Sequence, residues 1–358
     1  MKKNDILTKD FLERLSEVYG NAEATFQQVR YSKLAERFEN DFSENADIRF
    51  FSAPGRTEVG GNHTDHNNGK VLAAAINLDA VAAVSQRDDS IICVNSEGYP
   101  SISIDTKDLS VKNDEAGKST ALIRGICARF KQLGYKYGGF NASVTSRVLS
   151  GSGLSSSAAY EVLIGTILNY LYNDGKISAV EIAQISQYAE NVFFKKPCGL
   201  MDQTACSVGG FVQIDFKDTE NPVINKVDFD IAKHGYNLCI VDTGGCHADL
   251  TADYAAVPAE MKAVAAYFGK GILRDVNEDE FYMAIPKLRE TVSDRAILRA
   301  IHFFDDNRRA VVLKEKLKAN DFEGFKQTIL ESGKSSLQCL QNVFASLVKE
   351  LCLKDCFL

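Results

Sequence analysis

The hydrophobic and polar positions of this chain separate it into extended and helical segments, and the clearest change falls near residue 150. Residues 140–148 alternate apolar and polar side chains, which predicts a half-buried strand. Residues 158–171 place apolar side chains at helical spacing, which predicts a helix with a broad buried face. The short stretch between them is rich in glycine and serine. The pattern therefore predicts a strand, a glycine-rich loop and a helix in succession.

The same pattern predicts mostly strands in the first third of the chain and mostly helices after it. Apolar helical faces predict helices at residues 11–19, 32–42, 119–133 and 178–191, with a short helix after Gly199. Extended apolar runs predict strands at residues 48–52, 71–76, 80–85, 91–95, 101–105, 211–216 and 237–242. The sequence Ala53-Pro54-Gly55 is expected to end the first of these strands. This order of strands and helices is typical of an α+β fold.

The length of the chain predicts about two domains. At 358 residues it exceeds the usual size of a single hydrophobic core. Residues 217–230 are rich in acidic side chains, contain Pro222 and show little apolar periodicity, as a connection between domains does. We therefore expect an N-terminal domain at residues 1–216 and a C-terminal domain at residues 217–358.

Composition and charge argue against several classes of function. The chain is 45% hydrophobic and 25% charged, as globular proteins are, and its net charge of −7 argues against broad binding to nucleic acid or to anionic membranes. The start of the chain does not read as a signal peptide, and Asn77 and Asp79 interrupt the apolar residues 71–84, so no membrane span is expected. The nine cysteines form no C-x-x-C pair, which favours reduced thiols in a cytoplasmic protein.

The glycine-rich loop is a candidate anion site. Gly151 and Gly153 can adopt positive φ angles, and the first N–H groups of the following helix have no partner within that helix. These donors and the helix dipole attract phosphate. The predicted phosphate-binding residues are Gly151, Ser152, Gly153, Leu154, Ser155, Ser156, Ser157 and Ala158. The lysine of a Walker A loop is missing, and an ordinary turn with a serine cap is the alternative interpretation.

A second candidate site lies at residues 53–67, which read A-P-G-R-T-E-V-G-G-N-H-T-D-H-N. The pattern predicts a tight polar loop between two strands, and its many donors and acceptors suit a polyhydroxy ligand. His63 and His66 on either side of Asp65 raise metal binding as an alternative, although no third soft ligand accompanies them. A solvated polar turn is the other alternative.

Two further stretches bring polar side chains to the starts of predicted helices. In residues 196–203, K-P-C-G-L-M-D-Q, Asp202 stands just inside a short helix, where an aspartate more often caps the helix than catalyses a reaction. Residues 241–254, V-D-T-G-G-C-H-A-D-L-T-A-D-Y, lead from a predicted strand through glycines to another helix. An ordinary turn is the alternative there too.

In this order and at these separations, the four stretches resemble galactokinases, within the superfamily of galactokinase, homoserine kinase, mevalonate kinase and phosphomevalonate kinase. The loop G-L-S-S-S-A-A is similar to that of the whole superfamily, whereas A-P-G-R with H-T-D-H-N, C-G-L-M-D-Q and H-A-D-L-T-A-D-Y are similar to galactokinase motifs. The resemblance covers roughly residues 48–343. It implies a two-domain fold of the GHMP kinase type, with an N-terminal ribosomal-protein-S5-domain-2-like domain and a C-terminal ferredoxin-like domain.

The resemblance also implies an enzyme that uses ATP to phosphorylate the C1 hydroxyl of galactose. By the family pattern, Asp202 lies beside that hydroxyl, as a general base or as an electrostatic partner, and Arg56 keeps it ionised. Mg²⁺ would be held by Ser157 and Glu190, since this ion prefers oxygen ligands. The residues implied to hold the sugar are Asn62, His63, Asp65, Gly199 and Tyr254. The oligomeric state is left open.

The chain departs from the family pattern in the sugar-binding stretch and near its C-terminus. Galactokinases usually read G-R-V-N-L-I-G-E-H-T-D-Y, where this chain has Glu58, Asn62 and His66 in place of Asn, Glu and Tyr. Relatives continue into a third glycine-rich motif, and without it the C-terminal domain is expected to be incomplete. Three alternatives follow: a working galactokinase, a non-catalytic galactose and ATP binder or inactive fragment, and a kinase for a related sugar such as N-acetylgalactosamine.

Overall fold

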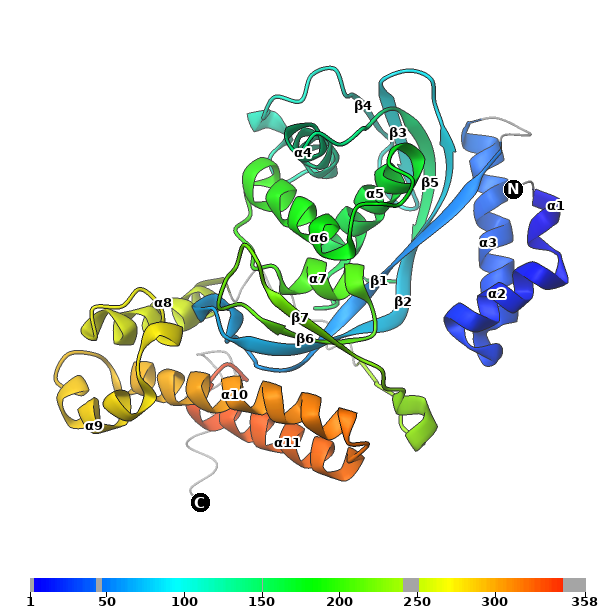
Figure 1. Ribbon diagram of the computed structural model, residues 1–358. Coiled ribbons are helices and arrows are strands. Elements are labelled where there is room, and N and C mark those ends of the chain that lie inside the picture. Colours follow the sequence, from blue (N-terminus) through cyan, green and yellow to red (C-terminus); the bar gives the residue numbers. More distant parts are fainter. Residues whose placement is uncertain (1–2, 43–46, 150, 241–250, 344–358) are drawn as a thin grey trace. The chain divides into compact units, whose positions relative to one another are not determined.

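The computed structural model describes residues 3–42, 47–149, 151–240 and 251–343 (Figure 1). It combines many helices with a mixed sheet, as the predicted α+β class requires. The chain divides into two compact units. The first unit contains Met1–Arg56 and Ala75–Gly209, and the second contains Thr57–Ala74 and Gly210–Leu358. The domain boundary proposed between residues 216 and 217 stays a prediction.

Helices and strands do not alternate regularly along the chain. The helices are α1 (Lys3–Ile6), α2 (Lys9–Tyr19), α3 (Asn21–Asp41), α4 (Ser119–Gln132), α5 (Ser156–Tyr172), α6 (Ala179–Tyr188), α7 (Met201–Val208), α8 (Thr251–Tyr267), α9 (Glu278–Leu288), α10 (Asp294–Lys318) and α11 (Phe322–Ser335). The strands are β1 (Arg49–Gly60), β2 (Lys70–Gln86), β3 (Ile91–Ser96), β4 (Ile102–Asp105), β5 (Phe140–Ser146), β6 (Phe211–Asp215) and β7 (Val223–Val227). Short 3-10 turns are η1 (Asp65–Asn67), η2 (Asn113–Glu115), η4 (Ile231–His234) and η6 (Leu273–Asp275), and π-helical turns are η3 (Ala189–Phe194) and η7 (Ser336–Leu340).

The sheet of the first unit has the strand order β4, β3, β5 and the last part of β2. β3 runs parallel to β5, whereas β4 is antiparallel to β3 and β2 is antiparallel to β5. The sequence predicts two strands at residues 71–76 and 80–85, but they form the single long strand β2. The polar residues between them do not end the strand, because Asn77 is exposed and buried Asp79 is paired with Arg30.

Helices cover both faces of β2 in the first unit (Figure 1). Val81 and Ala83 pack with residues of α1, α2 and α3, whereas Ala82 and Val84 pack with residues of α4, α5 and α6. Successive strand residues point to opposite faces, so this apolar run requires a layer on each side. The second predicted helix, at residues 32–42, begins earlier than expected and is the long helix α3.

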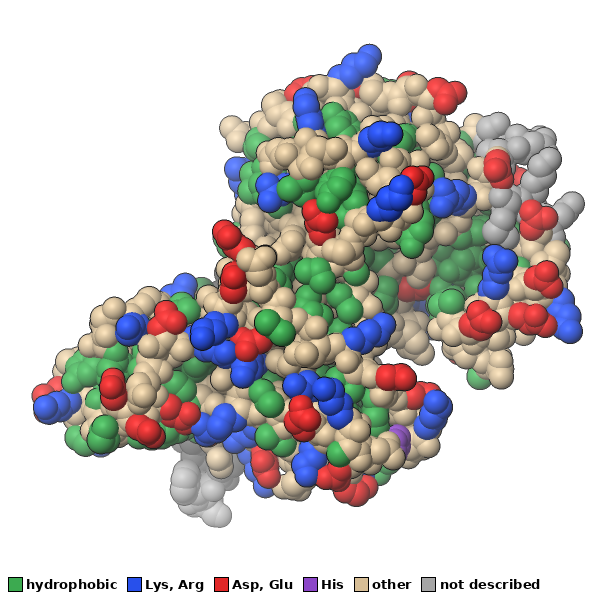
Figure 2. Space-filling view, in the orientation of Figure 1, with side chains coloured by type: hydrophobic (Ala, Val, Ile, Leu, Met, Phe, Trp, Pro, Cys, Tyr) green, Lys and Arg blue, Asp and Glu red, His purple; other side chains and the backbone are tan. Residues whose placement is uncertain are grey.

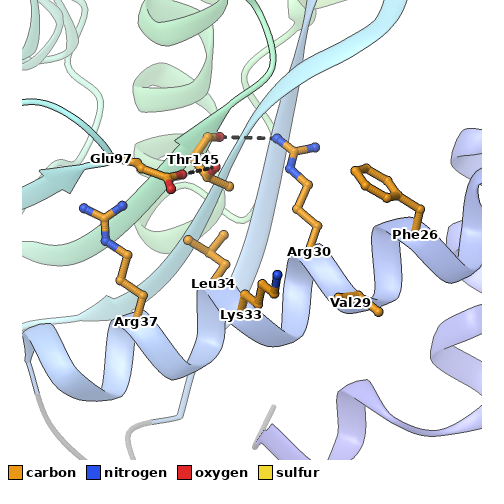
Figure 3. A pocket seen from close by; sticks show the side chains of 8 residues that line it. All are labelled: Phe26, Val29, Arg30, Lys33, Leu34, Arg37, Glu97 and Thr145. Atoms are coloured by element: carbon orange, nitrogen blue, oxygen red, sulfur yellow. Dashed lines mark hydrogen bonds between the residues drawn. The ribbon is translucent and has the colours of Figure 1, made fainter.

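A hollow of about 230 Å³ lies between α3 and the sheet of the first unit (Figure 3). Two of the basic side chains that line it form ion pairs with acidic residues: Arg30 with Asp79 at 2.5 Å and Arg37 with Asp41 at 3.5 Å. The residues that line it are Phe26, Val29, Arg30, Lys33, Leu34, Arg37, Glu97 and Thr145. None of them is a predicted site residue, so the hollow is a feature of how α3 packs on the sheet.

The second unit is built on a small antiparallel sheet. β6 pairs with the first residues of β2, Lys70–Ala74, and with β7. Leu72 and Phe211 from this sheet pack against Leu313 of α10 and Phe325 of α11. A second apolar cluster joins α8, α9 and α10. The mostly helical C-terminal part predicted from the sequence is confirmed over the described residues.

Three segments differ from their predictions. Residues 217–230, predicted as a connection, contain β7, in which only Val227 is buried, so the strand carries a weak apolar pattern. β1 does not end at residues 53–55 but continues through Pro54 to Gly60, and an edge strand tolerates a proline in this way. Arg56 and Glu58 therefore lie on a strand and not on a loop. The strand predicted at residues 237–242 is not seen at 237–240, and the rest of it falls outside the described residues.

Within the described residues, no helix is both long enough and apolar enough to cross a membrane. Acidic and basic side chains are interspersed over the visible face of the molecule (Figure 2).

Candidate active site

The glycine-rich loop between β5 and α5 has the backbone geometry of an anion site. Gly151 and Gly153 take positive φ angles of 77° and 74°, and Ser155, which precedes α5, takes a left-handed φ of 60°. The first backbone bond of the helix runs from the Ala159 N–H to the Ser155 carbonyl. The three N–H groups before Ala159 therefore have no i−4 partner inside α5, and they lie at the positive end of its dipole. Such a helix start favours binding of a phosphate.

Arg56 and Asp202 form a bidentate ion pair, although they lie 146 positions apart in the sequence. The Nε and Nη2 atoms of Arg56 donate to Oδ1 and Oδ2 of Asp202 at 2.8 and 2.9 Å. Ser155 of the loop also donates its hydroxyl to Oδ2 of Asp202. The Asp202 carboxylate, in the first turn of α7, is thus tied both to β1 and to the start of α5.

The ion pair keeps Asp202 ionised. Burial, the largest single influence, raises the pKa of this carboxyl. The charge of Arg56 and the hydrogen bonds from Arg56 and Ser155 together outweigh burial, so the pKa lies below its usual value. A carboxylate that is charged at neutral pH can accept a proton from a hydroxyl or stabilise positive charge nearby.

The same arginine also fixes the shape of the loop. Its Nη1 donates to the carbonyl of Gly153 at 2.7 Å, and its backbone N–H donates to the carbonyl of Leu154 at 3.1 Å. Gly55 allows this close approach, because a Cβ atom at that position would lie 2.8 Å from the Leu154 oxygen. The sequence A-P-G-R thus joins β1 to the candidate phosphate loop through its glycine and its arginine.

Glu190, the predicted metal ligand, lies in η3 with only 2% of its surface exposed. Its Oε1 accepts from the ammonium of Lys196 at 3.0 Å, so a cation already neutralises this carboxylate. Ser157, the other predicted ligand, is partly exposed in the first turn of α5. Among the residues described, no three His, Cys, Asp or Glu side chains are grouped to hold a metal. A single carboxylate with a hydroxyl fits Mg²⁺, which usually takes few protein ligands and completes its shell with phosphate and water.

Glu161 is a buried acid that the sequence reasoning missed. It is fully buried in α5, and its Oε2 accepts from Nε2 of Gln203 at 3.1 Å. The same nitrogen donates to Oε2 of Glu190 at 2.8 Å. Burial, followed by the charge of Glu190, raises the pKa of Glu161 well above its usual value. The available signal was a lone acidic residue inside the apolar face of a predicted helix.

His63 and Tyr254, two predicted sugar contacts, form an aromatic cluster with His66 in the second unit. The His66 Nε2 and the Tyr254 hydroxyl lie 3.2 Å apart, the rings of His63 and His66 stack at 5.6 Å, and Tyr254 meets His63 edge-on at 5.2 Å. Burial and the charges of His66, His302 and Arg299 lower the pKa of His63 to about 3, so it is neutral at physiological pH. Rings with polar edges suit the hydroxyl groups and apolar face of a sugar.

Asn62 is held by hydrogen bonds from helices far away in the sequence. Its backbone N–H donates to Asp306 at 3.0 Å, its carbonyl lies 2.9 Å from Nε2 of His302, and its side-chain amide donates to Ser336 at 3.0 Å. Asp306 and His302 are fully buried in α10. The Asn62 amide nitrogen is therefore engaged within the second unit, at the position where the family resemblance implies a sugar contact.

Asp65 and Gly199 complete the predicted sugar set. Asp65 begins η1, and its Oδ1 lies 3.9 Å from Nε2 of His66. Gly199 is exposed just before α7, in a turn held by the bond from the Cys198 N–H to the Asn191 side chain at 2.7 Å. Most of residues 241–254, including the predicted glycine turn, fall outside the described residues, and Tyr254 is described within α8.

Comparison with known proteins agrees with these motifs. The family model for the galactokinase galactose-binding signature matches residues 36–86, and the model for the N-terminal domain of GHMP kinases matches residues 121–210. Galactokinase from Streptomyces coelicolor is 32% identical over 293 residues, which cover 80% of this chain and 73% of the relative. This chain belongs to the galactokinase family. Galactokinase from Actinobacillus pleuropneumoniae is 35% identical over 280 residues, covering 75% and 69% of the two chains.

Solved structures agree on the fold of this family member. A structure of Lactococcus lactis galactokinase complexed with galactose aligns with a TM-score of 0.70 at 22% identity, covering 86% of this chain and 80% of that one. Streptococcus pneumoniae phosphomevalonate kinase aligns with a TM-score of 0.54 at 10% identity, covering 85% and 83%. The α+β GHMP kinase fold predicted from the resemblance is confirmed.

Proposed function

We propose that this protein is a sugar kinase that transfers the terminal phosphoryl group of ATP to the C1 hydroxyl of galactose. The observation that carries the proposal is the ion pair between Arg56 and Asp202, held against the candidate phosphate loop by Gly153 and Ser155. A protein that only binds sugar and nucleotide has no need for a partly buried, charge-paired carboxylate at this place. We also propose a cytoplasmic location, as the sequence predicts.

In the proposed reaction the C1 oxygen of the sugar forms a bond to the γ-phosphorus, and the bond from that phosphorus to the bridging oxygen of ADP breaks. The hydroxyl proton moves to Asp202 or onward to solvent, and the products are galactose 1-phosphate and ADP. Asp202 is suited to this because it is ionised and fixed in orientation by three hydrogen bonds. Phosphoryl transfer depends mainly on positioning and on charge neutralisation, and Arg56 contributes to both.

The loop and its helix would hold the triphosphate. Backbone N–H groups from Ser156 to Ala158 lie at the start of α5 without helical partners and would donate to phosphate oxygens. Ser157 and Glu190 would hold Mg²⁺, which neutralises charge on the transferred phosphoryl group. Lys196 pairs with Glu190 at 3.0 Å and would occupy one oxygen of that carboxylate until a metal is bound.

Galactose is the sugar we propose because the matched signature and the named relatives are those of galactokinases. We infer that His63, Asp65 and Tyr254 contact the sugar and that Gly199 lies against it. Asn62 would contribute through its side-chain oxygen and the second N–H of its amide, since the first N–H bonds Ser336. This difference from the family pattern is the reason to include related sugars in any test.

The deciding experiment measures ATP consumption with a panel of sugars, including galactose, N-acetylgalactosamine and glucose. We expect galactose to drive turnover, and Asp202→Asn to lower kcat by about 10²–10⁴-fold while galactose and ATP still bind by calorimetry. Binding of both ligands without turnover in the wild type would support a non-catalytic binder instead. Turnover confined to N-acetylgalactosamine would replace the proposed substrate with that sugar.

A further inference from the structure

A buried hydrogen-bond network in the first unit joins two glutamates, Glu161 and Glu190, through the side-chain amide of Gln203. Gln203 directs one nitrogen, Nε2, at both Glu161 and Glu190, with distances of 3.1 and 2.8 Å. Glu161 and Gln203 are fully buried, and Glu190 is 2% exposed. The two acceptor oxygens lie within about 6 Å of each other, because both contact the same nitrogen.

The chemistry of the two acids fixes the orientation of the amide. The Gln203 Nε2 group donates to both carboxyl oxygens and also lies 3.7 Å from the Cys198 sulfur, and the reversed amide would turn its own oxygen toward both acids. The amide therefore has one favourable orientation. In that orientation it restricts the position of Oε2 of Glu190, while Lys196 restricts Oε1 at 3.0 Å.

This network lowers the stability of the fold compared with an apolar packing of the same space. Oε1 of Glu161 and Oε1 of Gln203 are buried, and within the described part of the chain neither oxygen has a hydrogen-bond partner. Buried unsatisfied oxygens and neighbouring acids both disfavour folding. Apolar side chains of similar size would fill the same space in α5 and α7 at lower cost, so stability does not explain this arrangement.

Gln203 also directly follows Asp202 on α7. The turn of helix that carries the proposed catalytic carboxylate thus carries the amide that contacts the proposed metal ligand. Any rotation of this turn would move Asp202 and release Glu190 together.

We propose that Glu161 and Gln203 are positioning residues that hold the Glu190 carboxylate ready for a divalent cation bound with nucleotide. The inference rests on the proposed function through the role of Glu190. Neither residue contacts the reacting atoms: Glu161 acts by holding the Gln203 amide, and Gln203 acts by holding Glu190. Side chains that orient a metal ligand typically change metal affinity by about 10–100-fold when they are replaced.

The test measures Mn²⁺ binding to the full chain in the presence of ADP, by the loss of the free Mn²⁺ signal in electron paramagnetic resonance. Glu161→Met removes the acceptor for the amide, and Gln203→Asn shortens the amide so that it no longer reaches both acids. We expect each to weaken Mn²⁺ binding by about 10-fold or more. Glu161→Gln keeps the shape and one acceptor oxygen, so we expect it to restore binding to within about 3-fold of the wild type.

Thermal melts separate this role from a merely structural one. Asn169→Leu is the matched control, because it removes another buried amide of α5, whose side chain bonds the backbone of Ile177. We expect this control to lower the melting temperature without weakening Mn²⁺ binding, whereas Glu161→Met weakens Mn²⁺ binding with a smaller thermal loss. If one replacement of the network does not fold, the other still gives the metal affinity.

Two results would overturn the inference. One is wild-type Mn²⁺ affinity in both Glu161→Met and Gln203→Asn, and the other is wild-type affinity in Glu190→Gln, which removes the object of the positioning. Failure of the proposed function is a separate outcome, since Mn²⁺ binding with ADP needs no sugar. A wild-type protein that turns over no sugar, yet shows the expected order of affinities, would retain the inference and lose the proposed reaction.

Discussion

Arg56 and Asp202 meet through two parallel hydrogen bonds of 2.8 and 2.9 Å, and the third nitrogen of the same guanidinium donates to the Gly153 carbonyl. One planar group therefore sets both the charge of the candidate catalytic carboxylate and the course of the candidate phosphate loop. Lysine cannot replace this fork, because its ammonium is a compact charge without two parallel donors.

Arg56→Lys should therefore lower kcat by roughly 10²-fold. Because Arg56 is a main cause of the lowered pKa of Asp202, the replacement should raise that pKa. The acid limb of the kcat profile should then move to higher pH. A pH series of steady-state rates checks this, and an acid limb that does not move would separate Asp202 ionisation from catalysis.

The same shift makes a contribution to stability that depends on pH. The pKa of Asp202 is lower in the folded state than in the unfolded chain, where it is about 3.9. At pH values above the unfolded pKa this difference stabilises the folded state, and the stabilisation is lost as the pH falls through the folded pKa. Asp202→Asn should remove this contribution, so the melting temperatures of variant and wild type should converge on acidification. Thermal melts between about pH 7 and pH 3 measure the difference. A constant difference over that range would contradict the prediction.

Gly55 should be intolerant of a side chain. An added Cβ would lie 2.8 Å from the Leu154 oxygen and 3.0 Å from the Val148 side chain. Gly55→Ala should destabilise the protein by about 1–3 kcal/mol and raise the KM for ATP, because the loop must move away from β1. Gly271→Ala is the control, since an added Cβ there meets nothing within 4 Å. Denaturant melts of the two variants decide the point, and equal stabilities would argue against the close approach.

His66 should act together with Tyr254 in holding the sugar. The His66 ring nitrogen and the Tyr254 hydroxyl are 3.2 Å apart, so either replacement breaks the same hydrogen bond. His66→Phe and Tyr254→Phe should each raise the KM for galactose by about 3–10-fold with little change in the KM for ATP. The double variant should be no worse than the poorer single one, as coupled residues require. Additive losses in this double-mutant cycle would show that the two side chains act independently.

Restoring the family residue at position 62 should not improve the enzyme. In Asn62→Glu the carboxylate can no longer donate to Ser336, and it adds negative charge beside Asp306, which already accepts from the Asn62 N–H. We expect a loss of about 1–3 kcal/mol of stability and no decrease in the KM for galactose. Melting temperature and sugar kinetics test both parts. A stable variant with tighter galactose binding would instead show that the position contacts the sugar directly.

Local signals in the sequence were sufficient for much of the fold and for the candidate phosphate loop. Residues 140–148 and 158–171 gave a strand and a helix with nearly correct limits, since alternation and helical spacing are read over neighbouring residues. The family resemblance rested on short motifs of the same local kind. Prediction from neighbouring residues was wrong where a side chain pairs with a residue distant in the sequence. Asn77 and Asp79 suggested a break in β2, but Asp79 is buried against Arg30 and the strand is continuous.

The sequence by itself determined the α+β class, the galactokinase family and the residue types available for chemistry. Only the tertiary structure decided which of them meet: Arg56 with Asp202 across 146 residues, and Asn62 with Asp306 across 244. It also revealed Glu161, whose place in an apolar helix gives no sign of the amide that it shares with Glu190. The physical reason is that spacing along the chain encodes backbone geometry, whereas charge pairing and burial depend on contacts made only when the whole chain has packed.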